Sequence, residues 1–514
     1  MGMNESAHVA TNVMIDMAPD LRHPPRQDSS DKVLLLTDGR LLVSREYRTD
    51  FGVLTYKDQL KRLNIEFSEV EADPAVIERV ASGAAGLDAK KASTDHSERQ
   101  NDVLKIIRQA VEDKASDIHF LNYEKQTLVR WRIHGSLITK LKLLPEDGES
   151  LCRCMYESMT DDAGHSYLIR APQDGRLSRD FMKKAGLAGA RIATRPMEYG
   201  NIFVLRLLYT HDQARVTSLE DAGYLTEQIV LLETMLRRKG IILFSGETGS
   251  GKSSSLAILL RKLLKLFDGK INLLTIENPL EYVIDGAVQT ILTGDLDSPE
   301  GISRAWASAI TNVVRLDIDY FMVGELRDLA SALAAVTAAL TGHGLLSTIH
   351  AEEIFAILDR LADFGVDDRR LANPKLFKGF VNQSLAPILC KRCKVPFSTH
   401  YHELDAVTAD RVREFCNPDS VFLRGKDDQC PDCGGMGYVD RKLVAEVCVT
   451  NKALLEIYRK EGSAEARSYW VKKMNGITKN RHTIMRINDG ELDPFDGDTI
   501  VPLDEDALTI AEAA

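Results

Sequence analysis

Eight consecutive residues of this chain form a glycine-rich phosphate-binding motif. They fit the pattern G-x-x-x-x-G-K-S/T, and they are Gly246, Glu247, Thr248, Gly249, Ser250, Gly251, Lys252 and Ser253. In this motif the glycines let the backbone wrap around phosphates, the lysine reaches the β- and γ-phosphates, and the hydroxyl binds Mg²⁺. We therefore predict that the chain binds a nucleoside triphosphate, with Lys252 on the phosphates and Ser253 on the metal ion.

A strand and a helix are expected on either side of this loop. Residues 241–244 are apolar and predict a short buried strand, whereas residues 254–266 have the apolar period of a helix. A helix that begins at Ser254 directs its backbone N–H groups and its dipole toward the anion. A chance glycine-rich turn is the alternative, but such a turn does not need this flanking pair of elements.

Two segments with carboxylates follow predicted strands downstream of the loop. The strand at 271–276 is followed by Glu277 and Glu281, and the strand at 320–323 is followed by Gly324 and Glu325. Ligand-contacting groups of an open α/β sheet lie at the carboxyl ends of its strands. We predict that Glu325 activates the attacking water or holds Mg²⁺, helped by Glu277, and that Glu277 and Glu281 orient a water molecule or the outer ligands of Mg²⁺. The alternatives are a solvated acidic loop after the first strand and a surface Glu-Arg pair after the second.

Two histidines flank the next short predicted strand, within residues 341–350. A histidine near the γ-phosphate can stabilise it by a hydrogen bond and can sense its loss. We expect this role for His350, with a weaker claim for His343. A histidine satisfied within the core is the alternative at either position.

Four cysteines occur as two C-x-x-C pairs, namely Cys390, Cys393, Cys430 and Cys433. Each pair presents two thiolates from one tight turn, and two such pairs complete a tetrahedral Zn²⁺ site. The stretch between the pairs is longer than in a typical zinc ribbon. Cys416 therefore remains an alternative ligand, and redox dithiols or free buried cysteines remain alternatives to a structural zinc ion.

The composition is that of a soluble globular protein with several domains. A chain of 514 residues is too long for one hydrophobic core, and 44% hydrophobic and 27% charged residues are ordinary values. The net charge of -11 argues against broad nonspecific binding to nucleic acid. No apolar run approaches the roughly 20 residues that span a bilayer, and we expect no transmembrane segment. Because the cysteines do not suggest a disulfide scaffold and no secretory signal opens the chain, we expect a cytoplasmic protein.

Changes in composition divide the chain into regions. We expect residues 1–30 to be disordered and residues 31–95 to form a small mixed domain, with a strand pair around the Asp38-Gly39 turn. Residues 100–212 are predicted to form a second domain, with a helix at 103–114 and strands at 127–133 and 202–208. Residues 226–388 alternate strands and helices, which is typical of an α/β fold with a parallel sheet. The remaining regions are a cysteine module at 389–445, a helical region at 446–490 and an acidic tail at 491–514.

The motifs together resemble those of the secretion ATPases of type II secretion, type IV pili and related conjugative or type IV secretion systems. That family combines a Walker A loop, an Asp box, an atypical Walker B motif and a His box. The corresponding residues here are 246–253, 275–281, 324–328 and 341–350. Segments at 115–119, 129–135 and 172–176 resemble the N-terminal domain of the family, so the resemblance covers about residues 100–490.

This resemblance implies an α/β RecA-like P-loop domain, an α+β PAS-like domain before it and a mainly helical, zinc-bearing C-terminal module. The PAS-like domain of the family donates arginines to the nucleotide, and Arg191 and Arg206 stand at those positions. A guanidinium suits this role because it stays charged and pairs with phosphate oxygens in a fork. Either residue could instead be a structural surface arginine.

The chain departs from the family pattern at three places, one of which is the segment 317–319, where the proline usual in the family is missing. Asn278 replaces the usual aspartate of the Asp box, and His134 replaces an aspartate in the upstream turn. None of these changes removes Lys252, Glu325 or His350, so we expect hydrolysis to survive, with Glu277 carrying more of the role of the Asp box.

The expected function is that of a motor that hydrolyses ATP with Mg²⁺ and contains structural Zn²⁺. By resemblance, it forms a homo-hexamer at the cytoplasmic face of the inner membrane, peripherally attached, and acts through a polytopic platform protein on a pilin or a secreted substrate. Residues 31–95 would then correspond to a segment that docks onto a membrane partner. A DNA-translocating motor and a nucleotide-switched scaffold without hydrolysis are the alternatives; the acidic balance disfavours the first, and Glu325 and His350 disfavour the second.

Overall fold

The contacts of the chain divide it into two compact units. The computed structural model describes residues 20, 23–25, 29, 32–74, 76–77, 80, 98–161, 166–210, 216–278, 280–296 and 298–510. The first unit consists of Met1–Ile106 with Ser150–Met159, and the second consists of Ile107–Glu149 with Thr160–Ala514.

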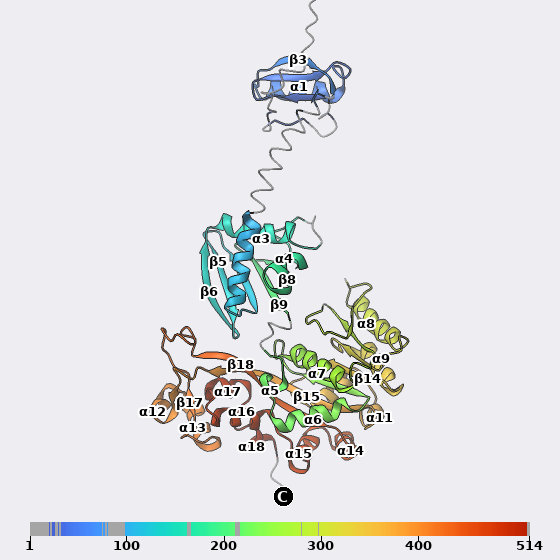
Figure 1. Cartoon of the computed structure of the whole chain (residues 1–514), viewed down its shortest axis with the longest axis vertical. Helices are drawn as coiled ribbons and strands as arrows, with labels where there is room; N and C mark the ends of the chain where they lie inside the picture. The colour runs from blue at the N-terminus through green and yellow to red at the C-terminus, as the bar shows by residue number, and fades with distance from the viewer. Residues whose placement is uncertain are drawn as a thin grey trace, which may run out of the picture. The chain divides into compact units, whose positions relative to one another are not determined.

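A small three-stranded sheet lies in the first unit. β1 (Val33–Leu35) and β2 (Arg40–Ser44) are antiparallel, and β3 (Ser68–Ala72) pairs parallel to β2 after the helix α1 (Phe51–Arg62). The strand pair expected around the Asp38-Gly39 turn is therefore present. Figure 1 shows α1 and β3 of this domain in blue.

The start of this small domain lies earlier in the chain than residue 31. Within residues 1–30, which we expected to be disordered, Asp20 and Ser29 are buried. The Asp20 N–H donates to Leu35 O at 2.8 Å, and the Ser29 carbonyl accepts from the Val33 N–H at 3.1 Å. Residues 1–19 lie outside the described residues, so that part of the expectation is untested.

A six-stranded sheet corresponds to the domain expected over residues 100–212. Its order is β6-β5-β4-β9-β8-β7, and all its neighbouring strands are antiparallel. Along β5, residues 127, 129, 131 and 133 are buried and the residues between them are partly exposed, as expected for a sheet with one covered face. The strands are β4 (Asp117–Asn122), β5 (Thr127–Ile133), β6 (Ser136–Leu143), β7 (Gln173–Leu177), β8 (Leu187–Pro196) and β9 (Asn201–Tyr209). Along the chain, residues 98–112 are helical, α3 (Pro145–Ser158) follows β6, and α4 (Arg179–Lys184) follows β7.

A seven-stranded sheet forms the centre of the second unit, in the order β12-β11-β13-β14-β10-β15-β18. Six strands are parallel, which confirms the α/β class with a parallel sheet. They are β10 (Ile241–Ser245), β11 (Leu273–Glu277), β12 (Val288–Ile291), β13 (Tyr320–Val323), β14 (Gly344–Thr348) and β15 (Phe377–Leu389). The seventh, β18 (Tyr438–Val449), pairs antiparallel to β15. We expected this domain to end at residue 388, but the chain returns after the cysteine module and adds β18 to the sheet.

Helices cover both faces of this sheet, and their elements can be followed in Figure 1. Ile242 and Phe244 pack against one set of helices, whereas Ile241 and Leu243 pack against the other. Successive side chains of a strand point to opposite faces, so a strand covered on both sides must be apolar throughout. The first set is α5 (Leu219–Ala222), α6 (Thr226–Leu236) and α7 (Lys252–Leu266), and the second includes α8 (Pro299–Val313), α9 (Leu329–Leu340), α10 (Ala356–Asp363), α14 (Lys452–Glu461) and α15 (Ser463–Met474).

The predicted acidic tail is folded up to residue 510. It contains α17 (Pro494–Ile500) and α18 (Glu505–Thr509). Two of its carboxylates, Asp498 and Asp504, bind the Arg411 guanidinium at 2.9 and 3.0 Å, respectively. Arg411 belongs to α13 (Ala406–Phe415), within the insertion between β15 and β18. At least these two negative charges of the segment therefore form ion pairs within the protein. Among the described residues, no helix is long and apolar enough to cross a membrane.

The helix α16 (Lys479–Asn488) packs on β18 with a polar face that includes His482. The side chain of His482 is 0% exposed, and its Nδ1 accepts from the Ala445 N–H at 3.1 Å. Its Nε2 has no hydrogen-bond partner among the described residues. Burial lowers the pKa of His482 to about 3, because a charged imidazolium would lose its hydration there.

This buried histidine predicts that acid destabilises the fold. As pH falls through the ordinary histidine pKa of about 6.5, the unfolded chain binds a proton that the folded chain does not bind until about pH 3. Between about pH 7.5 and pH 5 the wild type should therefore lose about 2 kcal/mol more unfolding free energy than His482→Gln, which keeps an acceptor for Ala445. Denaturant unfolding followed by circular dichroism measures both. The exposed His402→Gln is the control, and an equal pH dependence of His482→Gln and the wild type would refute the prediction.

Candidate functional site

The loop between β10 and α7 has the backbone geometry of an anion site. Gly246, Gly249 and Gly251 have φ angles of 134°, 82° and 84°, which glycine adopts without a steric cost. A Cβ at Gly246 would also lie 2.2 Å from Gln383 O, so the close approach of β15 requires glycine there. The N-cap of α7 is Gly251, which has no side chain to cap the helix. The backbone N–H groups of the first helical turn therefore have no side-chain cap and are available to an anion.

The ammonium group of Lys252 lies inside this loop. Its Nζ donates to Gly246 O at 2.7 Å and to Glu247 O at 2.8 Å. Burial lowers the pKa of Lys252, while the nearby carboxylates of Glu325 and Glu281 act in the opposite direction. The group is thus held by carbonyl oxygens at the position where phosphate oxygens would be its acceptors.

A cavity of about 620 Å³ begins at this loop and brings together most of the predicted site residues. Its wall joins the phosphate loop to acidic residues, one histidine and several arginines. The predicted residues in the wall are Thr248, Gly249, Ser250, Gly251, Lys252, Ser253, Ser254, Glu277, Glu281, Glu325, His350 and Arg206. Gly246 and Glu247 contribute the two carbonyl groups that hold Lys252.

The parallel sheet explains this convergence. Ile276 lies beside Val323, Val323 beside Ser347, and Phe244 beside Thr348. The strands β10, β11, β13 and β14 therefore end at the same edge. The residues that follow them, including Glu277, Glu325 and His350, are placed at this edge by the register of the strands.

The Glu277 carboxylate is buried and fixed by neighbours. It accepts from Thr275 Oγ1 at 2.7 Å and from Gln289 Nε2 at 3.2 Å, and it is 7% exposed. Burial raises the pKa of Glu277, and these hydrogen bonds oppose that shift. Asn278, the residue that departs from the family pattern, lines the same cavity.

The Glu325 carboxylate is oriented by two donors. Arg327 Nε donates to its Oε2 at 2.7 Å, and His350 Nε2 lies 3.0 Å from its Oε1. The side chain of Glu325 is 18% exposed, so it reaches the cavity while remaining largely buried. This arrangement suits a general base, because the carboxylate is held in place at the end of β13.

Arg206 of β9 reaches the cavity from the six-stranded sheet. Its Nε donates to Asp117 Oδ1 at 2.9 Å, and Arg132 Nε lies 4.0 Å from Asp117 Oδ2. All three residues line the cavity. Arg191 lies beside Arg206 on β8, with its guanidinium 3.9 Å from Glu281 Oε1, and burial lowers its pKa. Both arginines predicted to reach the phosphates are thus bound to carboxylates at or beside the cavity.

His343 is not brought to the cavity. It precedes β14, whereas His350 follows this strand. The Nδ1 atom of His343 lies 3.1 Å from both Ala338 O and Thr341 Oγ1, near the end of α9. The geometry does not support its predicted part in nucleotide binding, because ligand-contacting groups of a parallel sheet lie at the carboxyl ends of the strands.

Several residues of the cavity were not predicted as site residues. Asp117 and Arg132 occur in the upstream segments that resemble the family, which could have marked them. Trp306 of α8 had no local signal in the sequence. Its ring lies 3.3 Å from the position that a Cβ at Gly324 would take, and its buried Nε1 has no partner among the described residues. Gly324 therefore allows this ring to close the cavity next to Glu325.

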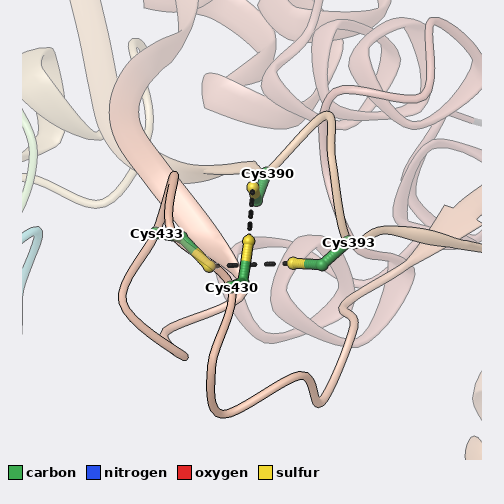
Figure 2. A group of neighbouring side chains, drawn as sticks. All are labelled: Cys390, Cys393, Cys430 and Cys433. Atoms are coloured by element: carbon green, nitrogen blue, oxygen red, sulfur yellow. Dashed lines mark hydrogen bonds between the residues drawn. The ribbon is translucent and has the colours of Figure 1, made fainter.

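The two C-x-x-C pairs form a single cluster, shown in Figure 2. The Sγ atoms of Cys390 and Cys430 are 3.8 Å apart, and those of Cys393 and Cys433 are 3.7 Å apart. All four Sγ atoms lie within 4.8 Å of one another. Tetrahedral zinc with bonds of about 2.3 Å places its sulfur ligands about 3.8 Å apart, whereas a disulfide requires about 2 Å. The four residues therefore fit a zinc ion and are not in disulfide geometry.

The sheet brings the two pairs together. The first pair follows β15, the second precedes β18, and Leu389 lies beside Tyr438 in the antiparallel register. The Gly437 N–H also donates to Cys433 Sγ at 3.2 Å. Cys416, the alternative ligand, ends α13 and packs against a separate hydrophobic core. Cys416 is outside the cluster.

The chain matches the family described as Type II/IV secretion system protein over residues 92–492. It is 32% identical over 362 residues to type II secretion system protein E of Pseudomonas aeruginosa, covering 70% of this chain and 67% of that protein. It is 30% identical over 375 residues to type II secretion system ATPase E of Vibrio cholerae, covering 72% and 70%, respectively.

Solved structures show a similar fold. The pilus retraction motor PilT with bound ADP has a TM-score of 0.51 at 21% identity, covering 78% of this chain and 96% of PilT. The ATPase DotB of Legionella pneumophila has a TM-score of 0.53 at 20% identity, covering 76% and 93%. These likenesses confirm the RecA-like ATPase fold predicted from the motifs.

The sulfur cluster predicts one zinc ion per chain. Replacing Cys393 and Cys433 together by serine should remove the metal, because two of the four thiolate ligands are lost. The bound zinc, measured by mass spectrometry of the purified protein, should fall from about one per chain to near zero, and the thermal midpoint should fall by several degrees. Cys416→Ser is the matched control and should keep its zinc. Full zinc content in the double variant would refute the assignment.

Proposed function

Because this chain belongs to the type II/IV secretion system protein family, we propose that it is an ATP-hydrolysing motor that powers protein export or the assembly of a type IV-like pilus. The observation that carries the proposal is the convergence of Lys252, Glu277, Glu325 and His350 on one cavity beside the phosphate loop. These four residues supply a phosphate-binding cation, two carboxylates and a hydrogen-bond donor, which together suit phosphoryl transfer to water.

The phosphate loop binds the triphosphate in this proposal. The N–H groups of the loop and of the first turn of α7 donate to phosphate oxygens. Lys252 exchanges the carbonyls of Gly246 and Glu247 for oxygens of the β- and γ-phosphates. The hydroxyl of Ser253 and the acidic groups Glu277 and Glu281 would hold Mg²⁺, which neutralises phosphate charge when bound.

Glu325 positions the attacking water and accepts its proton. Arg327 and His350 fix the orientation of this carboxylate, so little reorganisation is needed when the water attacks. His350 lines the cavity beside Glu325, where it can donate a hydrogen bond to a phosphate oxygen. The buried Glu277 carboxylate helps to order the same region.

Arg206 and Arg191 connect phosphate binding to movement of the six-stranded domain. Their present partners are Asp117 and Glu281, and a γ-phosphate offers acceptors of the same kind. Release of inorganic phosphate removes those acceptors and weakens the interaction. The arginines therefore make different contacts before and after hydrolysis, and such a difference is required if hydrolysis is to move the domain between two positions.

The oligomeric state and the cellular location in this proposal are taken from the family. The protein would work as a homo-hexamer at the cytoplasmic face of the inner membrane, in contact with a polytopic platform protein. Its action on a pilin or a secreted substrate would be indirect. The net charge of -11 gives no support to DNA as the transported substrate.

Lys252→Ala tests the phosphate site. The variant loses the ammonium group that contacts phosphate, so steady-state release of inorganic phosphate from Mg-ATP should fall by at least about a hundredfold. Lys265→Ala, an exposed lysine on the same helix, is the control and should keep wild-type turnover. Undiminished phosphate release by Lys252→Ala would end the proposal.

Glu325→Gln separates binding from hydrolysis. Glutamine keeps the shape of the side chain and one acceptor oxygen but cannot accept the proton, so turnover should fall by about 10²–10⁴. The affinity for a fluorescent ATP analogue should stay within about threefold of the wild type. Wild-type turnover in this variant would show that another residue is the base.

The two alternative functions predict different results for the wild-type protein. Stimulation of its ATP turnover by DNA would favour the DNA-translocating motor. Nucleotide binding without release of phosphate would favour the scaffold without hydrolysis.

A further inference from the structure

A chain of hydrogen bonds connects the phosphate loop to the C-terminal helices. Ser245, the last residue of β10, directly precedes Gly246, and its Oγ accepts from Asn382 Nδ2 at 2.9 Å. Asn382 belongs to the neighbouring strand β15, and its Oδ1 accepts from Lys479 Nζ at 2.9 Å. Ser245 and Asn382 are fully buried. Lys479 is the first residue of α16, so this helix is linked to the base of the phosphate loop through two side chains.

The same group of side chains holds the segment that follows His350. Asn382 Nδ2 also donates to Ala351 O at 3.1 Å, and Lys479 Nζ also donates to Glu352 O at 3.2 Å. Asn382 and Lys479 therefore each connect this segment to another element. The amide bridges it to Ser245, and the ammonium bridges it to β15.

Arg467, a residue of α15, also binds the segment that follows His350. Arg467 is buried, and its guanidinium donates to Glu353 Oε2 at 2.8 Å and to Glu446 Oε1 at 2.9 Å. Glu446 Oε1 accepts in turn from the backbone N–H of Lys479 at 3.0 Å. Residues 351–353 are thus bound at three successive positions by groups that belong to β15, α15 and α16.

The next residue of β15 holds the phosphate loop at a second point. Gln383 Nε2 donates to Ser250 O, within the loop, at 2.7 Å, and its Oε1 accepts from the buried Tyr224 hydroxyl at 2.6 Å. Asn382 and Gln383 point to opposite faces of the sheet because they are consecutive residues of one strand. The loop is therefore attached to β15 at Ser245 on one face and at Ser250 on the other. The Asn382 attachment is linked directly to α16 through Lys479.

We propose that Lys479 is a positioning residue for ATP hydrolysis, which sets the phosphate loop and the His350 segment relative to each other through Asn382. An ammonium group donates up to three hydrogen bonds from the end of a long flexible stem, which suits carbonyl acceptors on two different segments. Lys479 does not line the cavity, so it acts through Asn382 and the backbone and touches no substrate. The inference rests on the proposed ATPase function and adds the C-terminal helix α16 to the structure that supports the reaction.

Replacement of Lys479 by methionine in the full chain tests this inference. Methionine keeps an unbranched chain but removes all three donors, so kcat should fall by about tenfold to a hundredfold through misplacement of His350. The affinity for ADP should stay within about threefold, because Lys252 and the loop N–H groups remain. Lys479→Arg keeps a cationic donor and should recover most of the lost kcat. Arg481→Met, an exposed residue of the same helix, should match the wild type.

Hydrogen–deuterium exchange gives a readout that does not require hydrolysis. In Lys479→Met the amides of residues 349–355 should exchange faster than in the wild type, and they should not do so in Arg481→Met. Wild-type kcat and wild-type exchange in Lys479→Met would overturn the inference. An equal loss of kcat, ADP affinity and thermal stability in both Lys479 variants would also overturn it, because that result indicates a purely structural role. If the wild type releases no phosphate, the proposed function fails, and the exchange rates still decide whether Lys479 holds the segment.

Discussion

The proposed reaction depends on which oxygen atoms accept hydrogen bonds from the donor groups around the cavity. Lys252 binds two carbonyl groups of its own loop, Arg206 binds Asp117, and Arg327 and His350 bind Glu325. A triphosphate brings oxygens that bind the same donors, so its binding exchanges one set of acceptors for another. Whether Arg206 binds the terminal phosphate or Asp117 then depends on whether that phosphate is present, because the Asp117 carboxylate is always nearby. A conformational change driven by hydrolysis requires this kind of differential contact.

The C-terminal region belongs to the body of the ATPase fold. β18 completes the seven-stranded sheet, and the antiparallel pairing of β15 with β18 brings the two cysteine pairs together. α16 lies against β18, and its Arg486 donates to Leu443 O and to Gly223 O, in the segment that precedes α6. Gly223 has a φ angle of 105°, and a Cβ there would lie 2.9 Å from the Leu443 backbone nitrogen, so glycine is needed there. One helix therefore contacts the sheet and the segment before α6, and it is linked through Lys479 and Asn382 to Ser245, which precedes the phosphate loop.

The sequence predicted what depends on local pattern. The strands at 241–244 and 320–323, the phosphate loop and the four clustered cysteines all carry their signals within a few residues, and the structure has each of them. The pairing of β18 with β15 was missed because a long insertion separates them, and no local pattern reports a distant partner. The ion pairs of the acidic segment were missed for the same reason, since Arg411 lies far from Asp498 in the chain. The place of His343 outside the cavity could not be read from its motif, because a motif gives the order of residues but not which end of a strand each residue occupies.

A single-turnover experiment on the wild-type protein tests the central claim, that one cavity both holds and cleaves the terminal phosphate. Purified full-length protein in excess over γ-labelled ATP is mixed with Mg²⁺, quenched at intervals and analysed for labelled ATP and labelled phosphate. The account predicts that all bound ATP becomes ADP and inorganic phosphate with one exponential phase. Recovery of the labelled ATP unchanged, after a binding measurement has shown that all of it is bound, would contradict it.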